Sequence, residues 1–509
     1  MKNMSLKSTV SNQELFSKIE APKVQRSTFD RSHGLKTTLD AGTLYPVFID
    51  EAVPGDTYDV RSTMFGRFAT ALKPIMDNIN FDIHFFSVPM RLVWDNWEKF
   101  NGAQDNPADS TDFTIPTITA DGGGFDEESL FDYMGIPTKV GGIEVNALPM
   151  RAYNLIWNEW YRDENLQDSV DVFKDDGPDL ETEYTLLQRN KRKDYFTSAL
   201  PFQQKGDPVS IPLGTEAPVI SNSQNIQWSS QQGMGYRDAL IFQGETTLSI
   251  AGGPAVGTNH NLQFHPTNTG LKTDLSDATA ATINALREAF QIQRMYERDA
   301  RGGTRYIEII KAHFGVTSSD KRLQRPEYLG GGSVPINVTP IAQTSATDTG
   351  ASSQTPQGNL SAIGTFNANQ NGFIKTFEEH EYIIGLVSVR ADMTYQQGIN
   401  KLWSRSTRFD FYWPSFAHLG EQAVLNKEIY AQGTSADEDV FGYQERYAEM
   451  RYKPSLITGK YRSNATGTLD IWHLAQDFSA LPSLNSDFIE ENPPISRVVA
   501  TPSDRDWET

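Results

Sequence analysis

The side chains that most often perform chemistry in proteins are sparse and scattered in this chain. Eight His and no Cys occur among its 509 residues, which removes thiolate nucleophiles, disulfides and Cys-ligated metals together. The close pair His260 and His265 lacks the HExxH spacing of a zinc hydrolase, and no GxSxG nucleophile elbow is present. We therefore predict no catalytic residue, no cofactor and no metal ligand.

A run of three glycines invites a phosphate-binding interpretation. Gly330-Gly331-Gly332-Ser333 is followed by no Walker-type Lys, and Pro326 and Pro335 flank it where a strand-loop-helix unit would be needed. We expect this stretch to be a flexible loop between subunits.

Basic side chains next to aromatic rings are the best candidates for contact with nucleic acid, because cations meet phosphates and rings stack on bases. The candidates in the central run are Arg189, Lys191, Arg192, Lys193 and Tyr195. A solvated charged loop explains this run equally well. Residues 1–36 carry seven Lys or Arg against three acids, and the candidates there are Lys18, Lys23, Arg26 and Arg31.

The overall charge limits what these cations can do alone. The formal net charge is −20 at pH 7, whereas proteins that coat DNA unaided carry a basic excess. A monomeric nucleic-acid-binding module is therefore disfavoured. The uneven distribution gives a mildly basic N-terminal segment and an acidic remainder.

Alternating and helical patterns predict the elements that would position these residues. Ile79 to Phe85 alternates apolar and polar residues up to Pro89, which predicts a strand with one buried face. A short helix is expected to follow, through Trp97 to the turn at Asn101. Leu44–Asp50 and Thr57–Thr63 are further strands, separated by a hairpin-like turn.

Aromatic residues form a stripe on the clearest predicted helix, Ala152 to Leu166. Such a stripe is more often core or subunit interface than a ligand cage, and large rings are enriched at interface hot spots. Rings and cations also interleave between residues 443 and 453, which is compatible with a nucleic-acid face or with cation–π packing at a subunit contact. The candidates for packing or subunit contact are Trp94, Trp97, Trp157, Trp160, Tyr447, Arg451 and Tyr452.

Composition changes divide the rest of the chain. Helices are expected from residue 283 and after Thr304, a candidate N-cap, with the nearby arginines in structural ion pairs. The tract from Ala342 to Gln370 is low in charge and apolar content and predicts a long loop. Strands are expected at Glu381–Arg390 and Phe409–Trp413.

Short strands at both ends of the chain predict the fold class. Together with long loops between them, they suit a mainly β, eight-stranded antiparallel jelly roll with several short helices. The expected divisions are an arm at 1–30, a first part of the jelly roll at 31–201, a surface insertion at 202–280, and the remaining strands at 281–509. The longest apolar run, near Tyr382 to Val387, is too short to cross a membrane, and no export signal is indicated.

Seven stretches together resemble the major capsid proteins of microviruses, and most closely those of the gokushovirus branch. They are SHGLKTTLDAGTLYPVFIDEAVPGDT (Ser32 to Thr57), MDNINFDIHFFSVPMRLVWDNWEKFNG (Met76 to Gly102), NKRKDYFTSALPFQQKG (Asn190 to Gly206), ERDARGGTRYIEIIKAHFGV (Glu297 to Val316), RLQRPEYLGGGSVPIN (Arg322 to Asn337), YQERYAEMRYKPSLITGKYRS (Tyr443 to Ser463) and PPISRVVA (Pro493 to Ala500). The resemblance extends from near residue 25 to near residue 500 and is specific in combination.

This resemblance implies a virion protein that assembles in the host bacterial cytoplasm into a small T=1 icosahedral shell around circular single-stranded DNA. It also implies a small basic internal protein as partner, with scaffolding and pilot proteins as further possible partners. The insertion at 202–280 would project outward at threefold axes, where host recognition is suspected. The alternative from another class is a jelly-roll protein that binds or cleaves carbohydrate, which the many aromatic and acidic residues would suit.

Overall fold

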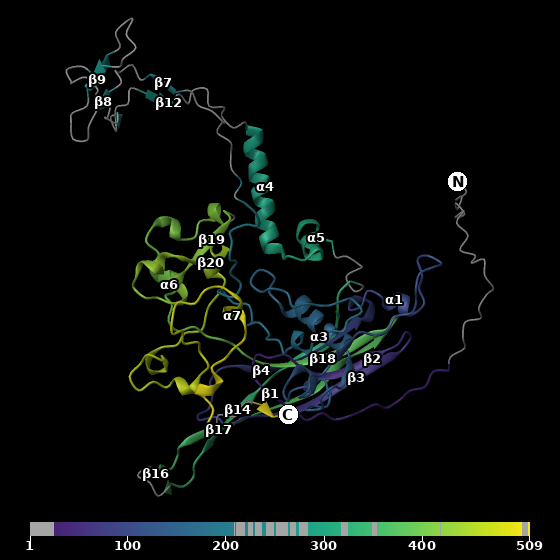
Figure 1. Cartoon of the computed structure of the whole chain (residues 1–509). Coiled ribbons are helices and arrows are strands. Elements are labelled where there is room, and N and C mark those ends of the chain that lie inside the picture. Colours follow the sequence, from purple (N-terminus) through teal and green to yellow (C-terminus); the bar gives the residue numbers. More distant parts are fainter. Residues whose placement is uncertain are drawn as a thin grey trace, which may run out of the picture.

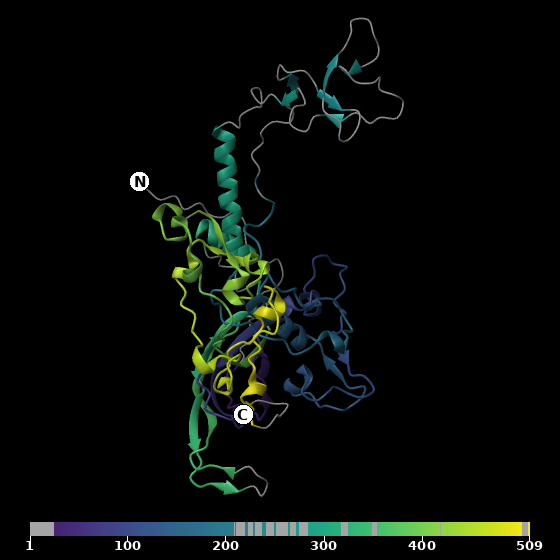
Figure 2. The same cartoon turned by 90° about the vertical axis from the view of Figure 1, so that its left-hand side faces the viewer.

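Two facing β-sheets form the centre of the molecule (Figures 1 and 2). The computed structural model describes residues 25–207, 283–316, 324–348, 354–417, 419–500 and 507–508, together with short pieces between 209 and 273. The four-stranded sheet has the order β13 (Glu327–Pro335), β4 (Ile79–Pro89), β18 (Glu381–Ala391) and β2 (Tyr45–Ala52). The five-stranded sheet has the order β1 (Thr38–Leu39), β21 (Trp507–Glu508), β3 (Thr57–Phe68), β17 (Leu360–Thr376) and β14 (Asn337–Ala342).

All neighbouring strands in both sheets run antiparallel. The mainly β, antiparallel fold predicted from the sequence is thus confirmed. Among the described residues the two sheets contain nine strands, so the predicted count of eight is not confirmed. The β14–β17 pair extends beyond the sheets to a short ladder of β15 (Thr347–Asp348) and β16 (Gln354–Thr355), as Figures 1 and 2 show.

Strand alternation builds the core between the two sheets. Phe81 and Ile83 of β4 are buried there, and the ring of Phe81 stacks on Phe366 of β17 with a centroid distance of 4.2 Å. The predicted strand at 79–85 is confirmed and runs on to Pro89. Because alternate residues point to opposite faces, Asp82 and His84 must leave this core and face the other side of the sheet.

The turn at Pro54-Gly55-Asp56 does not close a hairpin. The two strands that it joins, β2 and β3, are present as predicted, but β2 pairs with β18 while β3 pairs with β17 and β21. The chain therefore crosses from one sheet to the other at this turn, which fits a two-sheet sandwich.

Helix α3 (Leu148–Ile156) packs on the outer face of the four-stranded sheet. It continues as one π-helical turn over Trp157–Tyr161, so the helix begins four residues before the predicted start and ends five before the predicted end. A second apolar cluster, formed by α3, β4 and β18, fills the space beneath it.

Smaller elements complete the described part of the chain. The helices are α1 (Trp97–Phe100), α2 (Leu130–Tyr133), α4 (Ile283–Gly302), α5 (Tyr306–Phe314), α6 (Asn426–Ile429) and α7 (Ser486–Ile489). The outlying strands are β5 (Thr117–Thr119), β6 (Glu144–Asn146), β7 (Val219–Ser221), β8 (Gln227–Ser229), β9 (Arg237–Leu240), β10 (Ser249–Ile250), β11 (Gln263–Phe264), β12 (Leu271–Thr273), β19 (Glu421–Leu425) and β20 (Val440–Glu445). None of the helices described is long and apolar enough to cross a membrane.

The glycine run predicted as a flexible loop is instead part of a strand. Gly330, Gly331 and Gly332 lie in β13, which pairs with β4 along its length. A Cβ at Gly331 would collide with the carbonyl oxygen of Ile83, and one at Gly332 would collide with the side chain of Asn371. Glycine is required here because neighbouring strands approach closely, not because the chain must flex.

Three other sequence predictions are wrong. The second half of the predicted loop at 342–370 belongs to β17, whose core-facing positions Ala362, Gly364 and Ala368 are too small to give a hydrophobic signal, so that Phe366 stands alone among them. The expected strand at 409–413 is absent, because this segment is held in 3₁₀ turns with its rings exposed. Thr304 is not the N-cap of α5, since that position is taken by Arg305.

Candidate functional site

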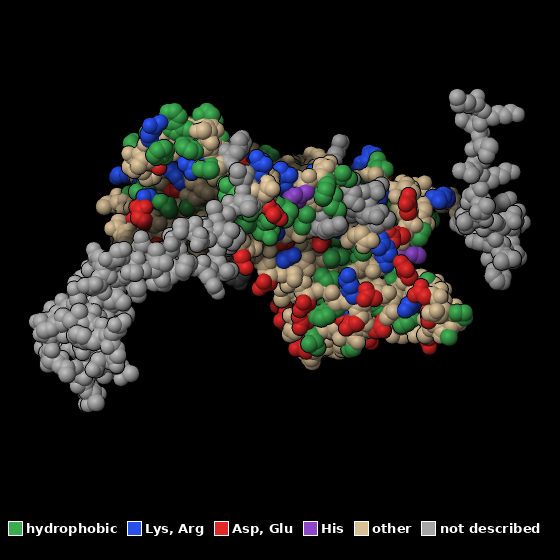
Figure 3. Space-filling model, turned by 90° about the horizontal axis from the view of Figure 1, so that it is seen from above, with side chains coloured by type: hydrophobic (Ala, Val, Ile, Leu, Met, Phe, Trp, Pro, Cys, Tyr) green, Lys and Arg blue, Asp and Glu red, His purple; other side chains and the backbone are tan. Residues whose placement is uncertain are grey.

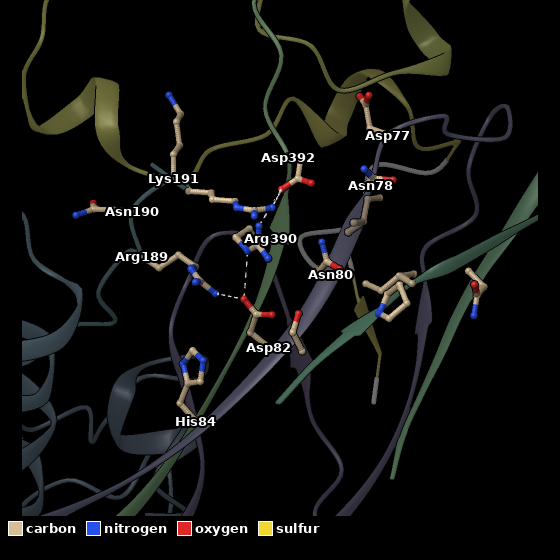
Figure 4. Close-up of a pocket in the computed structure, with 16 residues that line it drawn as sticks. Asp77, Asn78, Asn80, Asp82, His84, Arg189, Asn190, Lys191, Arg390 and Asp392 are labelled. Atoms are coloured by element: carbon tan, nitrogen blue, oxygen red, sulfur yellow. Dashed lines mark hydrogen bonds and ion pairs between the residues drawn. The ribbon is translucent and has the colours of Figure 1, made fainter. Parts of the chain in front are cut away.

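A polar pocket of about 800 Å³ opens at one end of the four-stranded sheet (Figure 4). The ends of β4, β13 and β18 line it together with residues 189–192, which include most of the basic run singled out in the sequence. Register brings the strand residues together, because Asp82 of β4 lies opposite both Ser333 and Ser388, and Arg390 lies opposite Asn80.

The pocket is organised around the buried carboxylate of Asp82. Arg189 donates to it at 2.6 Å and Arg390 at 3.2 Å, and Figure 4 shows both guanidinium groups converging on it. Arg189 also donates to the Ser388 hydroxyl at 2.7 Å. Burial alone would raise the pKa of Asp82, but the charge of Arg189, helped by Ser333 and Arg390, outweighs burial and lowers that pKa.

His84 lies beneath this ion-pair cluster and is neutral at physiological pH. Its Nδ1 lies 2.8 Å from the hydroxyl of Tyr161. Burial, and then the positive charge of Arg189, lower the pKa of His84 to about 4. This imidazole therefore serves as a hydrogen-bonding spacer between sheet and π-helical turn.

Arg192 is the basic residue of the pocket that remains most available to a partner. Its side chain is 72% exposed and lies 3.8 Å from Asp392, which is held more closely by Arg390 at 2.9 Å. A guanidinium group this exposed, next to a rim of asparagines, can bind a phosphate or a carboxylate.

The remaining members of the basic run are engaged within the chain. Lys191 is buried, donates to the backbone carbonyl of Phe488 and lies 4.6 Å from the centre of that ring. Burial lowers the pKa of Lys191 to about 8, and its side chain points away from Asp82 in Figure 4. Lys193 donates to Asp163 and to the carbonyl of Thr197.

Tyr195, Arg26 and Arg31 do not line the pocket. The ring of Tyr195 is buried, and its hydroxyl donates to Glu428 at 2.9 Å. Arg26 donates to the carbonyl of Gly55, and Arg31, with a 63% exposed side chain, pairs with Asp50 at 2.8 Å. Lys18 and Lys23 lie outside the described residues.

Most of the tryptophans predicted to pack do so within the chain. Trp94 is fully buried and donates to Asp176 at 2.8 Å, and Trp97 packs beside it with a centroid distance of 6.2 Å. Trp157 is buried and donates to the carbonyl of Gln188. Trp160 remains 38% exposed, with Arg325 stacked 4.3 Å from its ring.

The predicted contact residues Tyr447, Arg451 and Tyr452 also make contacts within the chain. Tyr447 is buried, with a left-handed φ of 66°, and donates to the carbonyl of Phe411 at 3.1 Å. Arg451 is exposed and pairs with Glu445, and Tyr452 packs against Tyr195 with a centroid distance of 5.9 Å.

Sequence reasoning also predicted ion pairs for the arginines near residue 300, and the structure contains them. Arg301 at the end of α4 pairs with Glu421 of β19 and, at 3.7 Å, with Glu297. Arg305 pairs with Glu159 at 3.0 Å, with Glu164, and with Glu308. These pairs hold α4 and α5 against the π-helical turn and the lobe that contains β19.

Two central residues of the pocket, Asp82 and Arg390, escaped the sequence predictions. The one usable signal was the polar face of the alternating strand at 79–85, which carries Asp82. Nothing in the sequence indicates that Arg390, 308 residues away, completes the same cluster.

The described residues include no group of three or more side chains suited to hold a metal ion. The pocket presents paired charges and amides, which suit recognition of a polar partner. Two antiparallel sheets with long insertions are the architecture of a jelly-roll protein of the kind that forms viral shells.

Comparison with known proteins agrees with this class. The profile of the family described as capsid protein (F protein) matches residues 17–509. The capsid protein VP1 of Bdellovibrio phage phiMH2K is 52% identical, over 96% of this chain and 92% of the relative. The VP1 of Chlamydia phage 1 is 43% identical, over 99% and 96%, and that of Spiroplasma virus 4 is 37% identical, over 94% and 90%.

The chain belongs to the capsid protein (F protein) family of phages. It is a major capsid protein of the gokushovirus type and a structural component of the virion, not an enzyme. Its biochemical activity is association with other copies of itself.

Proposed function

We propose that copies of this chain close into a small T=1 icosahedral shell around a circular single-stranded DNA genome, in the cytoplasm of the bacterial host. Membership of the capsid protein family over nearly the whole chain carries this proposal. Heterologous contacts repeated around fivefold and threefold axes close a shell when the rotations return to the start.

The charge of the chain supports a basic partner inside the shell. Each subunit contributes a formal charge of −20, so the shell and the DNA repel one another. A small basic internal protein would neutralise both, as the resemblance to microviruses implies. Scaffolding and pilot proteins are further partners that we propose for the chain.

Arg192 and Arg31 are predicted interior contacts whose side chains are largely exposed, at 72% and 63%. Arg192 is only loosely paired with Asp392 at 3.8 Å, and Arg31 is paired with Asp50 at 2.8 Å. Because both guanidinium groups are largely exposed, each can exchange its protein carboxylate for a DNA phosphate. The proposal assigns them to the DNA, or to an acidic group of the internal protein, ahead of Lys191 and Tyr195, which are buried. The insertion at 202–280 is assigned to host attachment by its position in the chain.

Particle mass and shape test the proposal. The protein is co-expressed with its neighbouring viral genes, and the product is measured by sedimentation and negative-stain electron microscopy. Uniform icosahedral particles are expected. A stable monomer or small oligomer under these conditions would contradict self-closing assembly.

DNA content tests the interior contacts separately. The double variant Arg31→Gln, Arg192→Gln should form particles of normal size that retain less DNA, or release it at lower salt, because two phosphate contacts are lost. Arg61→Gln is the matched control, since Arg61 has a 70% exposed side chain and pairs with Asp59, two residues away. Equal DNA retention by both variants would remove Arg31 and Arg192 from the genome contacts.

A further inference from the structure

Five large aromatic rings lie exposed in one short segment between residues 403 and 413. They are Trp403, Phe409, Phe411, Tyr412 and Trp413, with exposed fractions of 79%, 54%, 53%, 51% and 41%. We call them the aromatic patch. Each such ring has roughly 150–250 Å² to bury, so the patch leaves on the order of 500 Å² of ring surface open to solvent.

The part of the patch from Phe409 to Trp413 is held by hydrogen bonds, although it is exposed. The Asp410 carboxylate accepts hydrogen bonds from Ser406 and Thr407 and thereby closes a tight 3₁₀ turn. The Trp413 indole donates to the carbonyl of Arg408 at 2.8 Å. The buried hydroxyl of Tyr447 also holds this segment. It accepts a hydrogen bond from the backbone N–H of Trp413 and donates one to the backbone carbonyl of Phe411.

Arginines are stacked on these rings. Arg408 lies 5.6 Å from the centre of Phe409 and 5.2 Å from that of Trp413, and Arg405 lies 5.7 Å from that of Phe411. Arg405 pairs with Glu449 at 3.3 Å. In the described part of the chain, Arg408 has no carboxylate partner.

Rings and arginines kept in fixed positions at the surface are the composition of a protein interface hot spot. We propose that the aromatic patch is a docking surface for a second copy of this chain. The inference rests on the proposed shell, and it assigns to one named surface a contact that the shell requires.

The size of the patch favours a protein occupant. A standard interface buries about 800 Å² on each partner, and a monomer rarely exposes more than about 300–600 Å² of contiguous apolar surface. With Leu402 and Leu419, which are 56% and 61% exposed, the exposed apolar surface of this segment approaches the area that one side of an interface needs.

The chemistry of the aromatic patch favours a protein as its binding partner over single-stranded DNA. Bases stack on free ring faces, but arginines already lie over three of the five rings of the patch. Leu402 and Leu419 offer no face for stacking. A protein surface can bury rings, aliphatic side chains and arginines together.

Charge determines which surface of the second copy fits. Two patches facing each other would bring their arginines together, which like-charge repulsion disfavours. The same chain supplies an acidic alternative, because residues 101–138 contain eight Asp or Glu and no Lys or Arg. Figure 3 shows hydrophobic and basic side chains together on the upper-left lobe and acidic ones concentrated on another part of the molecule. The contact is therefore heterologous, the kind that builds rings and closed shells.

A single engineered cysteine tests this inference in the whole protein, because the natural chain has none. Ser415 is exposed in the turn Pro414–Phe416 beside the patch. Ser415→Cys particles, filled with DNA or emptied by nuclease, and dissociated subunits are treated with a maleimide dye. We expect labelling at least about tenfold slower in both kinds of particle than in free subunits, because interface contacts exclude solvent.

Each other outcome overturns the inference in its own way. Rapid labelling in emptied particles, with protection only in filled ones, would assign the patch to DNA. Rapid labelling in both would leave it as a free outer surface, with the proposed shell intact. Disulfide formation on oxidation between the introduced thiols of two Ser415→Cys copies would show patch against patch and would overturn the heterologous contact. If the wild-type chain forms no particles, the proposed function fails and this inference fails with it.

A second variant measures the contribution of the ring that is most exposed. Trp403→Ala should raise the protein concentration needed for assembly by about thirtyfold, as loss of a hot-spot residue does. Ile374→Ala, at a 69% exposed apolar residue of β17, is the control and should assemble like the wild type. Normal assembly of Trp403→Ala would overturn the role of this ring.

Discussion

At the scale of single residues, Arg151 shows how a buried charge ties the helical layer to the loops around it. Its side chain has no exposure and donates to Asp179 at 2.7 and 2.5 Å and to the carbonyls of Val93 and Asp175. Removing one partner of a buried pair leaves the other charge unpaired in a medium that solvates it poorly.

Arg151→Met should therefore lower the free energy of unfolding of the subunit by about 3–5 kcal/mol. Chemical denaturation of dissociated subunits measures it. The matched control is Arg61→Met, whose exposed pair with Asp59 should contribute less than about 1 kcal/mol. Similar losses in the two variants would mean that water reaches Asp179.

Glu491 makes the stability of the subunit depend on pH. Its side chain is fully buried and accepts from the backbone of Ala391 at 2.9 Å. Burial raises its pKa from 4.5 to about 7, against the opposing charges of Arg189, Lys191 and Arg390. The folded state thus holds a proton that the unfolded state has released.

The stability that this proton gives is complete below pH 4.5 and is lost as pH rises to about 7. Glu491→Gln keeps the acceptor oxygen and cannot ionise. As pH rises from 4.5 to about 7, the wild type loses this stability and the variant does not. The unfolding free energy of the variant minus that of the wild type should therefore increase by on the order of 3 kcal/mol. Denaturation at several pH values measures the slope, and parallel curves for the two proteins would refute the assignment.

For single residues, the sequence indicated only part of the candidate site. The basic run was visible, and so was the alternation that turns Asp82 out of the core. Burial of Lys191 and Tyr195, and exposure of the rings at 403–413, depend on which distant segments cover them. Lys191 is covered by Phe488, 297 residues away in the chain, and no local pattern encodes that contact.

At the scale of elements, strands of the two sheets were predicted where their side chains are large and were missed where they are small. Strands β4 and β18 carry bulky residues at alternate positions and were predicted. Strands β13 and β17 were predicted as loops, because Gly331 and Ala368 satisfy packing that allows no larger side chain. Small residues at such positions give the same sequence signal as a flexible linker.

Gly331→Ala tests this explanation. The new Cβ would collide with the carbonyl oxygen of Ile83 on β4, and backbone atoms cannot rotate away. We expect β13 to separate from β4 and the subunit to lose about 3 kcal/mol or more of unfolding free energy. At Gly122 a Cβ would meet nothing within 4 Å, so Gly122→Ala should be nearly neutral in the same denaturation experiment. Comparable stability of both variants would restore the loop interpretation.

At the scale of the whole molecule, the charge of −20 opposes the association that the fold serves. Copies approaching within a Debye length, about 10 Å at 0.1 M salt, repel one another before any contact forms. The aromatic patch and its arginines act only at contact distance. Apolar burial must therefore overcome a long-range repulsion that dissolved salt weakens.

Assembly of empty particles should consequently improve as ionic strength rises. Between about 0.05 and 0.5 M sodium chloride, the protein concentration required for assembly is expected to fall several-fold, because the Debye length shortens from roughly 14 to 4 Å. Light scattering of DNA-free subunits measures it. Retention of DNA through a basic partner should weaken over the same range, because counterion release opposes it. Empty particles that dissociate as salt rises would indicate instead that ion pairs across the subunit contacts, between arginines such as Arg408 and acids of the next copy, outweigh the repulsion between whole subunits.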